Sequence, residues 1–173
     1  DRPVAAAGNV GQPVTGLATT GLPEGTTVVC ECSSFQLEDS IEFAPECAVY
    51  LNLAPDHLDR HAGMEAYAAA KLKIFENQVE GDVAIINAGP EGPGTDLAGG
   101  NAARLFFRAG DGLEERYDAD LRDGMIFVDG EPLMPESDLK VLGRHNVANA
   151  MAAALAAISM GLGREQVAAG LAS

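Results

Sequence analysis

The chain has 173 residues, 47% of them hydrophobic, which is enough for one domain with a sizeable core. Eleven basic residues against 26 acidic ones give a formal charge of −15, which argues against an extensive nucleic-acid surface. No hydrophobic run reaches the roughly eighteen residues of a membrane span, and the polar start Asp1-Arg2-Pro3 does not resemble a signal peptide, so we expect a cytoplasmic protein without a membrane partner.

The first half of the chain alternates strand and helix patterns. Short runs rich in Val, Ile, Ala and Thr predict strands at 4–7, 26–32, 47–53 and 82–87. Hydrophobic residues at helical spacing predict a helix over 64–76. Strands that alternate with helices are typical of a parallel sheet with right-handed crossovers.

The second half changes character after a Gly/Pro-rich loop at 89–94. Several short strand-like pieces lie between 104 and 128, and Asp129-Gly130 between hydrophobic residues predicts a hairpin over 125–133. Helices are predicted at 146–160 and 164–172, separated by Gly161 and Gly163. The predicted fold class is therefore α/β, a mostly parallel sheet flanked by helices, with a small antiparallel edge.

Three cysteines, Cys30, Cys32 and Cys47, are too few for a disulfide framework and lack partners at zinc-finger spacing. All three fall in strand patterns, so we expect core thiols.

Glu31 lies at the C-terminal end of a predicted buried strand and precedes Ser33 and Ser34. Ligands bind at the carboxyl ends of parallel strands, so a carboxylate there can hold Mg²⁺. A second interpretation is that one of the serines caps a short helix, with Glu38 in its first turns. Capping explains the serines and Glu38 but leaves Glu31 unexplained.

Segment 56–61, Asp-His-Leu-Asp-Arg-His, places two aspartates and two histidines between a strand and a helix. Such a cluster is typical of a metal site, and a charged helix-entry loop has a similar composition. The residues alone leave both interpretations open.

Lys71 lies among small and hydrophobic residues of the predicted helix 64–76. Its side chain can extend to solvent along the helix surface. Alternatively, burial can lower the pKa of its amine, which can then take up CO₂ and become a carbamate that serves as an oxygen ligand for metal.

His145, Asn146 and Asn149 gather at the start of the predicted helix 146–160. Asn146 is a good N-cap residue. The three side chains also share a helix face, and such a group can bind the edge of a purine.

Taken together, four segments resemble the central domain of the Mur ligase family, the ATP-dependent amide ligases that build the peptidoglycan stem peptide. They are 33–38 (Ser-Ser-Phe-Gln-Leu-Glu), 55–61 (Pro-Asp-His-Leu-Asp-Arg-His), 71–77 (Lys-Leu-Lys-Ile-Phe-Glu-Asn) and 143–146 (Gly-Arg-His-Asn). Their order and spacing match over nearly the whole chain. The first segment is most similar to members that add D-glutamate to UDP-N-acetylmuramoyl-L-alanine, because members that add diaminopimelate or lysine usually have Ser-Ser-His there.

The resemblance implies a reaction with ATP and Mg²⁺. The γ-phosphoryl of ATP passes to the substrate carboxylate, and the amine of D-glutamate attacks the resulting acyl phosphate. By this resemblance, Glu31 holds the Mg²⁺ between the β- and γ-phosphates, and His57 and a carbamylated Lys71 hold a second Mg²⁺. The residues implied to contact the UDP-muramoyl substrate are Asn9, Ser33 and Gln36. Those implied to line the adenine–ribose site are His145, Asn146 and Asn149.

The chain also departs from the family pattern. The phosphate-binding Gly-x-x-Gly-Lys-Thr/Ser loop and its strand and helix, the P-loop unit, have no match in this sequence. The resemblance then implies a single, truncated central domain over 1–173, without the uridine-binding and C-terminal ligase domains. We expect such a chain to be inactive alone and to self-associate through the face that the P-loop unit leaves bare.

Two other functions remain open on the residues. A metal-dependent phosphohydrolase would use Asp56, His57, Asp59 and His61, without any role for Lys71 or Asn146. A folded but non-catalytic scaffold module is the second alternative.

Overall fold

The computed structural model describes residues 2–55, 60–95, 97, 99–110 and 117–173. Its helices are α1 (Val14–Thr20), α2 (Ser34–Glu38), α3 (Met64–Leu72), α4 (Arg144–Ser159) and α5 (Arg164–Leu171), with short 3-10 turns η1 (Lys73–Phe75) and η2 (Glu136–Asp138). Its strands are β1 (Val4–Gly8), β2 (Thr27–Glu31), β3 (Cys47–Tyr50), β4 (Val83–Asn87), β5 (Ala103–Arg108), β6 (Ala119–Arg122), β7 (Met125–Val128) and β8 (Glu131–Pro135).

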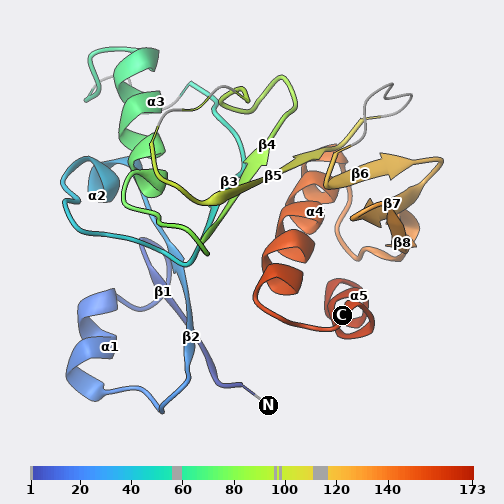
Figure 1. The fold of residues 1–173 in the computed structure, drawn as a ribbon, viewed down its shortest axis with the longest axis horizontal. Helices are drawn as coiled ribbons and strands as arrows, with labels where there is room; N and C mark the ends of the chain where they lie inside the picture. The colour runs from blue at the N-terminus through green and yellow to red at the C-terminus, as the bar shows by residue number, and fades with distance from the viewer. Residues whose placement is uncertain (1, 56–59, 96, 98, 111–116) are drawn as a thin grey trace.

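The main sheet has six strands in the order β3-β4-β5-β6-β7-β8. The pairs from β3 to β6 are parallel, and β6, β7 and β8 pair antiparallel at one edge (Figure 1). The β7–β8 turn has positive φ at both Asp129 (53°) and Gly130 (79°), as a tight two-residue hairpin requires. The predicted α/β fold, mostly parallel with an antiparallel edge, is confirmed.

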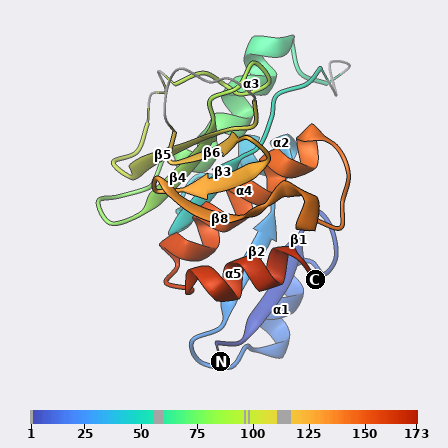
Figure 2. The ribbon, with the colours of Figure 1, turned by 90° about the vertical axis from the view of Figure 1, so that its right-hand side faces the viewer.

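Both faces of this sheet are covered at β4, whose run Val-Ala-Ile-Ile is hydrophobic without alternation. Ile85 of β4 belongs to a core formed with Met151 and Leu155 of α4, whereas Ile86 belongs to a second core with Phe75 of η1. α4 and α3–η1 therefore lie on opposite faces of the sheet. α5 packs beside α4 and β8 (Figure 2).

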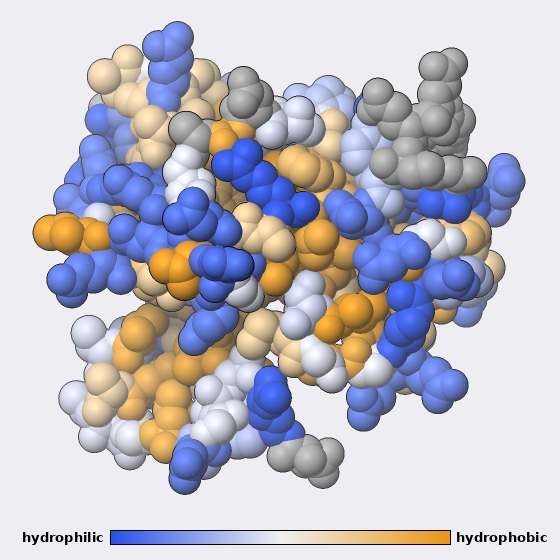
Figure 3. Space-filling view, viewed as in Figure 1, coloured by the Kyte–Doolittle hydropathy of each residue, from blue (hydrophilic) through white to orange (hydrophobic). Residues whose placement is uncertain are grey.

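The first two strands form a separate parallel sheet of their own. In the described part of the chain, β2 pairs with β1 and with no other strand, a difference from the one sheet predicted. Val4 is 67% and Val29 59% exposed, and Val10, Val14, Leu22 and Val28 are exposed as well. Figure 3 shows hydrophobic side chains at the lower left, where Figure 1 places α1, β1 and β2.

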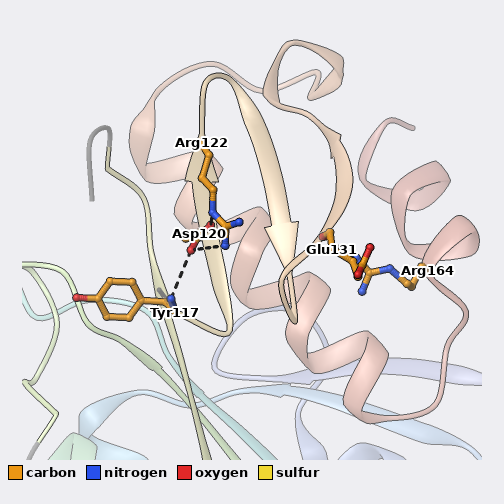
Figure 4. Close-up of polar contacts among 5 residues, drawn as sticks. All are labelled: Tyr117, Asp120, Arg122, Glu131 and Arg164. Atoms are coloured by element: carbon orange, nitrogen blue, oxygen red, sulfur yellow. Dashed lines mark hydrogen bonds and ion pairs between the residues drawn. The ribbon is translucent and has the colours of Figure 1, made fainter. Parts of the chain in front are cut away.

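Polar contacts hold the antiparallel edge together (Figure 4). Arg122 of β6 makes a two-point ion pair with the buried Asp120, with its Nε 2.6 Å and its Nη2 2.9 Å from the two carboxylate oxygens. The guanidinium also lies 4.2 Å from the Phe127 ring centroid. Arg164 at the start of α5 donates to the Glu131 carbonyl at 2.9 Å, which ties α5 to the β7–β8 hairpin.

The cysteines are free, and each is half-buried. Cys47 packs against the α4 core, in keeping with a core thiol, and burial raises its pKa to about 11. Cys30 and Cys32 belong to neither hydrophobic core, so the expectation of core thiols is wrong for these two. Their sulfurs lie 3.6 Å apart, and burial, followed by the hydrogen bond to Cys30, raises the pKa of Cys32 to about 12.

No helix of the described residues is both long and hydrophobic enough to cross a membrane.

Candidate functional site

Asn9 and Glu31 lie together at the carboxyl ends of β1 and β2. The Asn9 backbone N–H donates to the Glu31 carbonyl at 2.8 Å. Gly8 has φ 122°, and a Cβ at this position would overlap the same carbonyl oxygen, so the two backbones can approach only because residue 8 is glycine. The exposed Glu31 side chain thus stands at the strand end, where a carboxylate ligand was predicted.

Ser33 and Gln36 form a capping box at the start of α2. The Gln36 backbone N–H donates to Ser33 Oγ at 3.3 Å, and Gln36 Oε1 accepts from the Ser33 N–H at 2.9 Å. The predicted cap is therefore confirmed at Ser33. Its partner is Gln36, and Glu38 is the last residue of this five-residue helix. The side chains of Ser33 and Gln36, both predicted to bind substrate, are thus fixed at the start of the helix that follows Glu31 in the chain.

Ser34, the next residue, points into the protein. Its Oγ lies 3.0 Å from His61 Nε2, and both side chains are buried. His61 is therefore engaged inside the fold, which counts against a phosphohydrolase that would use it as a metal ligand. The rest of that predicted cluster, Asp56, His57 and Asp59, lies outside the described residues.

Lys71 is half-buried on α3, and its ammonium rests on aromatic rings. Nζ lies 5.2 Å from the ring centroid of Tyr67 and 5.8 Å from that of Tyr50, within the range of cation–π attraction. Burial raises the pKa of Tyr50 to about 12, with a smaller contribution from Tyr67. The Lys71 amine is thus held over two rings instead of extending freely to solvent.

Three polar residues that the sequence analysis did not single out fasten α3–η1 to the segment after α2. Lys73 Nζ donates to the Glu38 and Ser40 carbonyls at 2.7 and 2.9 Å. Asn77 Nδ2 donates to Ile41 O at 2.8 Å, and the buried Gln78 donates to Pro45 O at 2.9 Å. Helical spacing gave no signal for this group, because Asn77 and Gln78 lie beyond the predicted helix 64–76 and Lys73 lies in η1.

The start of α4 differs from its prediction. The helix begins at Arg144 with Gly143 as N-cap, so Asn146 is not the capping residue. Its Nδ2 instead donates to the Leu142 carbonyl at 2.8 Å. His145 and Asn149 are exposed on the same helix. The predicted purine-binding residues therefore belong to a helix on the opposite face of the main sheet from Lys71.

The described residues contain no group of three or more His, Cys, Asp or Glu side chains placed to hold a metal ion. Of the predicted Mg²⁺ ligands, Glu31 is a free carboxylate at a strand end and Lys71 is an amine that becomes an oxygen ligand only as a carbamate. His57 lies outside the described residues. Glu31 can therefore serve as one ligand of a hard cation such as Mg²⁺, whereas binding of a second ion depends on modification of Lys71.

A surface hollow of about 680 Å³ lies elsewhere, between β5, β6 and the β7–β8 turn. Tyr117, Asp118, Arg122 and Asp129 are among its lining residues, and none of the predicted site residues belongs to it. The one cation among those residues, Arg122, is already paired with Asp120. We therefore place the candidate site at β1, β2, α2 and α3.

Comparison with known proteins identifies the family. The model of a protein family, the Mur ligase middle domain, matches residues 16–157. The chain belongs to the Mur ligase family.

Within that family, the chain is similar to UDP-N-acetylmuramoylalanine–D-glutamate ligases. It is 39% identical over 164 residues to the enzyme of Koribacter versatilis, covering 92% of this chain and 36% of that protein. It is 38% identical over 161 residues to the enzyme of Geobacillus kaustophilus, covering 93% and 35%. The chain thus spans about a third of the length of these curated relatives and is homologous to their central, ATP-binding domain.

Solved structures support the fold. A crystal structure of MurF from Acinetobacter baumannii matches with a TM-score of 0.60 at 16% identity, covering 99% of this chain and 45% of that one. A second crystal structure of MurF from the same organism matches with a TM-score of 0.59 at 18% identity.

Proposed function

We propose that this chain is the ATP-binding middle domain of a cytoplasmic ligase that adds D-glutamate to UDP-N-acetylmuramoyl-L-alanine in peptidoglycan synthesis. The observation that carries the proposal is 39% identity over 92% of the chain to a D-glutamate-adding ligase. Support also comes from the segment 33–36, Ser-Ser-Phe-Gln, which resembles that of members of the family that add D-glutamate.

The proposed reaction has two chemical steps. The γ-phosphoryl of ATP passes to the carboxylate of UDP-N-acetylmuramoyl-L-alanine, which releases ADP and gives an acyl phosphate. The amine of D-glutamate then attacks the acyl carbon, and inorganic phosphate leaves through a tetrahedral intermediate. Such chemistry depends on positioning and on stabilising negative charge, with water kept out.

Each predicted residue has a task in this proposal. Asn9, Ser33 and Gln36 bind and orient the UDP-muramoyl substrate at the ends of β1 and β2. His145, Asn146 and Asn149 line the adenine–ribose site at the start of α4. Mg²⁺ would be held by Glu31, by His57 and by Lys71 as a carbamate, and when bound it neutralises charge on the phosphates.

Formation of the carbamate is a balanced reaction of Lys71. The Lys71 ammonium first gives one proton to water. The lone pair of the resulting neutral Nζ forms an N–C bond to CO₂, one C=O π pair moves to oxygen, and a second N–H proton leaves to water. The positive charge is replaced by a negative one, and a cation that would repel Mg²⁺ becomes an oxygen ligand. At 4 Å the interaction of two unit charges is about 4 kcal/mol at an effective dielectric constant near 20, so the reversal of sign matters.

The proposal includes flanking parts: the uridine-binding and C-terminal ligase domains and the P-loop unit. The separation of β1–β2 from the main sheet, with exposed valines on β2, supports a strand and helix of that unit packing there. Without the backbone N–H groups and lysine of a phosphate loop, we expect the 173-residue chain to neither bind Mg-ATP with micromolar affinity (about −8 kcal/mol) nor release ADP. Calorimetric titration tests this, and self-association through the bare face would appear as a dimer in analytical ultracentrifugation.

The deciding experiment is an ADP-release assay on the ligase that carries this domain. We expect turnover with UDP-N-acetylmuramoyl-L-alanine and D-glutamate, and none with L-lysine or diaminopimelate. Lys71→Ala should abolish turnover, with partial recovery in acetate or formate, whereas Lys140→Ala, at an exposed lysine, should have no effect. Equal turnover with diaminopimelate would overturn the substrate assignment.

The same assay separates the alternatives. ATP hydrolysis that needs no amine would favour the phosphohydrolase, and an absence of any turnover by the complete ligase would favour a non-catalytic scaffold.

A further inference from the structure

His61 is the centre of a buried cluster that joins α2 to α3. The cluster, called here the His61 cluster, consists of Ser34, Phe35, His61 and Tyr67. Ser34 and His61 are 27 positions apart in the chain, yet their side chains meet at 3.0 Å, and they are only 3% and 5% exposed. A buried polar pair of this kind is costly to break, because each partner would lose its hydrogen bond without gaining water.

Aromatic contacts fix the orientation of the imidazole. The His61 ring lies nearly parallel to Phe35, with centroids 5.3 Å apart and an interplanar angle of 9°. Tyr67 packs against His61 in a tilted arrangement, also at 5.3 Å. The hydrogen bond to Ser34 lies in the plane of the imidazole, whereas the stack on Phe35 contacts its face. Together the two contacts restrict the orientation of the ring.

Tyr67 connects the His61 cluster to Lys71. Tyr67 precedes Lys71 by one helical turn, and its ring centroid lies 5.2 Å from Lys71 Nζ. The contacts thus run from α2, which carries Ser33 and Gln36, through His61 and Tyr67 to the amine on α3.

We propose that His61 is a positioning residue, which, held by Ser34 and stacked on Phe35, fixes the Tyr67 ring beneath Lys71 and so places that amine relative to α2. The structural part of this inference stands on the contacts alone. Its consequence for catalysis rests on the proposed function of Lys71.

The test separates the hydrogen bond from the packing. His61→Phe keeps a ring for the stack but leaves the Ser34 hydroxyl buried without its partner. The double variant Ser34→Ala/His61→Phe removes both polar groups, so the buried hydroxyl is no longer stranded, and stability should recover toward that of the unchanged protein. His61→Asn retains a hydrogen-bonding group but loses the stack.

The first measurement is NMR on the 173-residue chain and needs no catalysis. Ring currents of Tyr50 and Tyr67 should displace the Lys71 ε-methylene proton signals upfield, relative to those of exposed Lys140. We expect this displacement to shrink in His61→Phe and to remain reduced in the double variant, even where its denaturation midpoint has recovered. An unchanged Lys71 signal in the folded double variant would overturn the proposal, and failure of that variant to fold would show that His61 acts in folding instead.

The second measurement uses the complete ligase. A misplaced Lys71 should lower kcat about ten- to a hundredfold in the double variant, with an unchanged KM for D-glutamate, because a displacement of about 1 Å can have such an effect. Unchanged kcat together with a changed NMR signal would refute the role of His61 in catalysis. A shifted Lys71 signal in a protein that makes no amide bond at all would instead refute the proposed function and leave the positioning role intact.

Discussion

The six-stranded sheet and the β1–β2 pair are built from similar residues but are buried very differently. Ile85 and Ile86 of β4 are completely buried, because α4 covers one face of the sheet and α3–η1 the other. Val28 and Val29 of β2 are 40% and 59% exposed, since α1 is the one helix that packs closely on this pair in the described structure. A hydrophobic strand therefore does not ensure a core, which requires partners on both faces.

The largest effect should come from truncating a side chain in the main sheet. Phe107 on β5 is fully buried, so Phe107→Ala should lower the free energy of unfolding by about 3–5 kcal/mol through lost burial and a residual cavity. Denaturant-induced unfolding, followed by circular dichroism, measures this change.

Val29→Ala is the matched truncation in the exposed pair. Because Val29 is 59% exposed, its change should stay within about 0.5 kcal/mol. Equal losses from both variants would mean that the β1–β2 pair is covered in solution, for example by self-association.

An effect that is more local, and smaller than that of Phe107→Ala, is expected at Gly8. Gly8→Ala would force a Cβ against the Glu31 carbonyl at φ 122°, which should weaken the β1–β2 pairing by about 1–3 kcal/mol. Amide hydrogen exchange should speed up in β1 and β2 but not in β4 and β5. Gly11→Ala is the control, because φ 83° is also strained there but no atom lies within 4 Å of the added Cβ.

The remaining effect, visible only at alkaline pH, should be a pH dependence that originates in the main sheet. Burial raises the pKa of Cys47 from 9.0 to about 11, so its contribution to stability is complete below pH 9.0 and is lost as the pH rises toward about 11. As the pH rises, the Cys47 thiol loses its proton at a lower pH in the unfolded chain than in the folded one. Ionisation therefore stabilises the unfolded chain relative to the folded one.

Denaturation midpoints measured across that pH window should fall less in Cys47→Ala than in the unchanged chain. Cys47→Ser is a second control that keeps the size of the side chain but removes the titration. If the denaturation midpoints of both variants fall as steeply with pH as that of the unchanged chain, the pH dependence comes from other groups.

Sequence periodicity predicted the elements well where one local signal dominated. The hydrophobic run at 82–87 predicted the strand that forms β4, and Asp129-Gly130 predicted the hairpin, because two successive positive φ angles favour these residue types. A helix cap at one of the two serines was also predicted from the residues, and the structure shows that it is Ser33. The predicted N-cap at Asn146 was wrong because Gly143, at φ 104°, already starts α4 one turn earlier.

By itself, then, the sequence determined the α/β class, the antiparallel edge and the segments by which the Mur ligase family is recognisable, since each depends on neighbours in the chain. The tertiary structure alone decided that His61 meets Ser34, that Lys71 rests on Tyr50 and Tyr67, and that Lys73 holds the carbonyls after α2. It also decided that β1–β2 stands apart from the main sheet. These contacts join residues far apart in the chain, and no local pattern encodes which distant side chain will satisfy a buried polar group or cover a hydrophobic face.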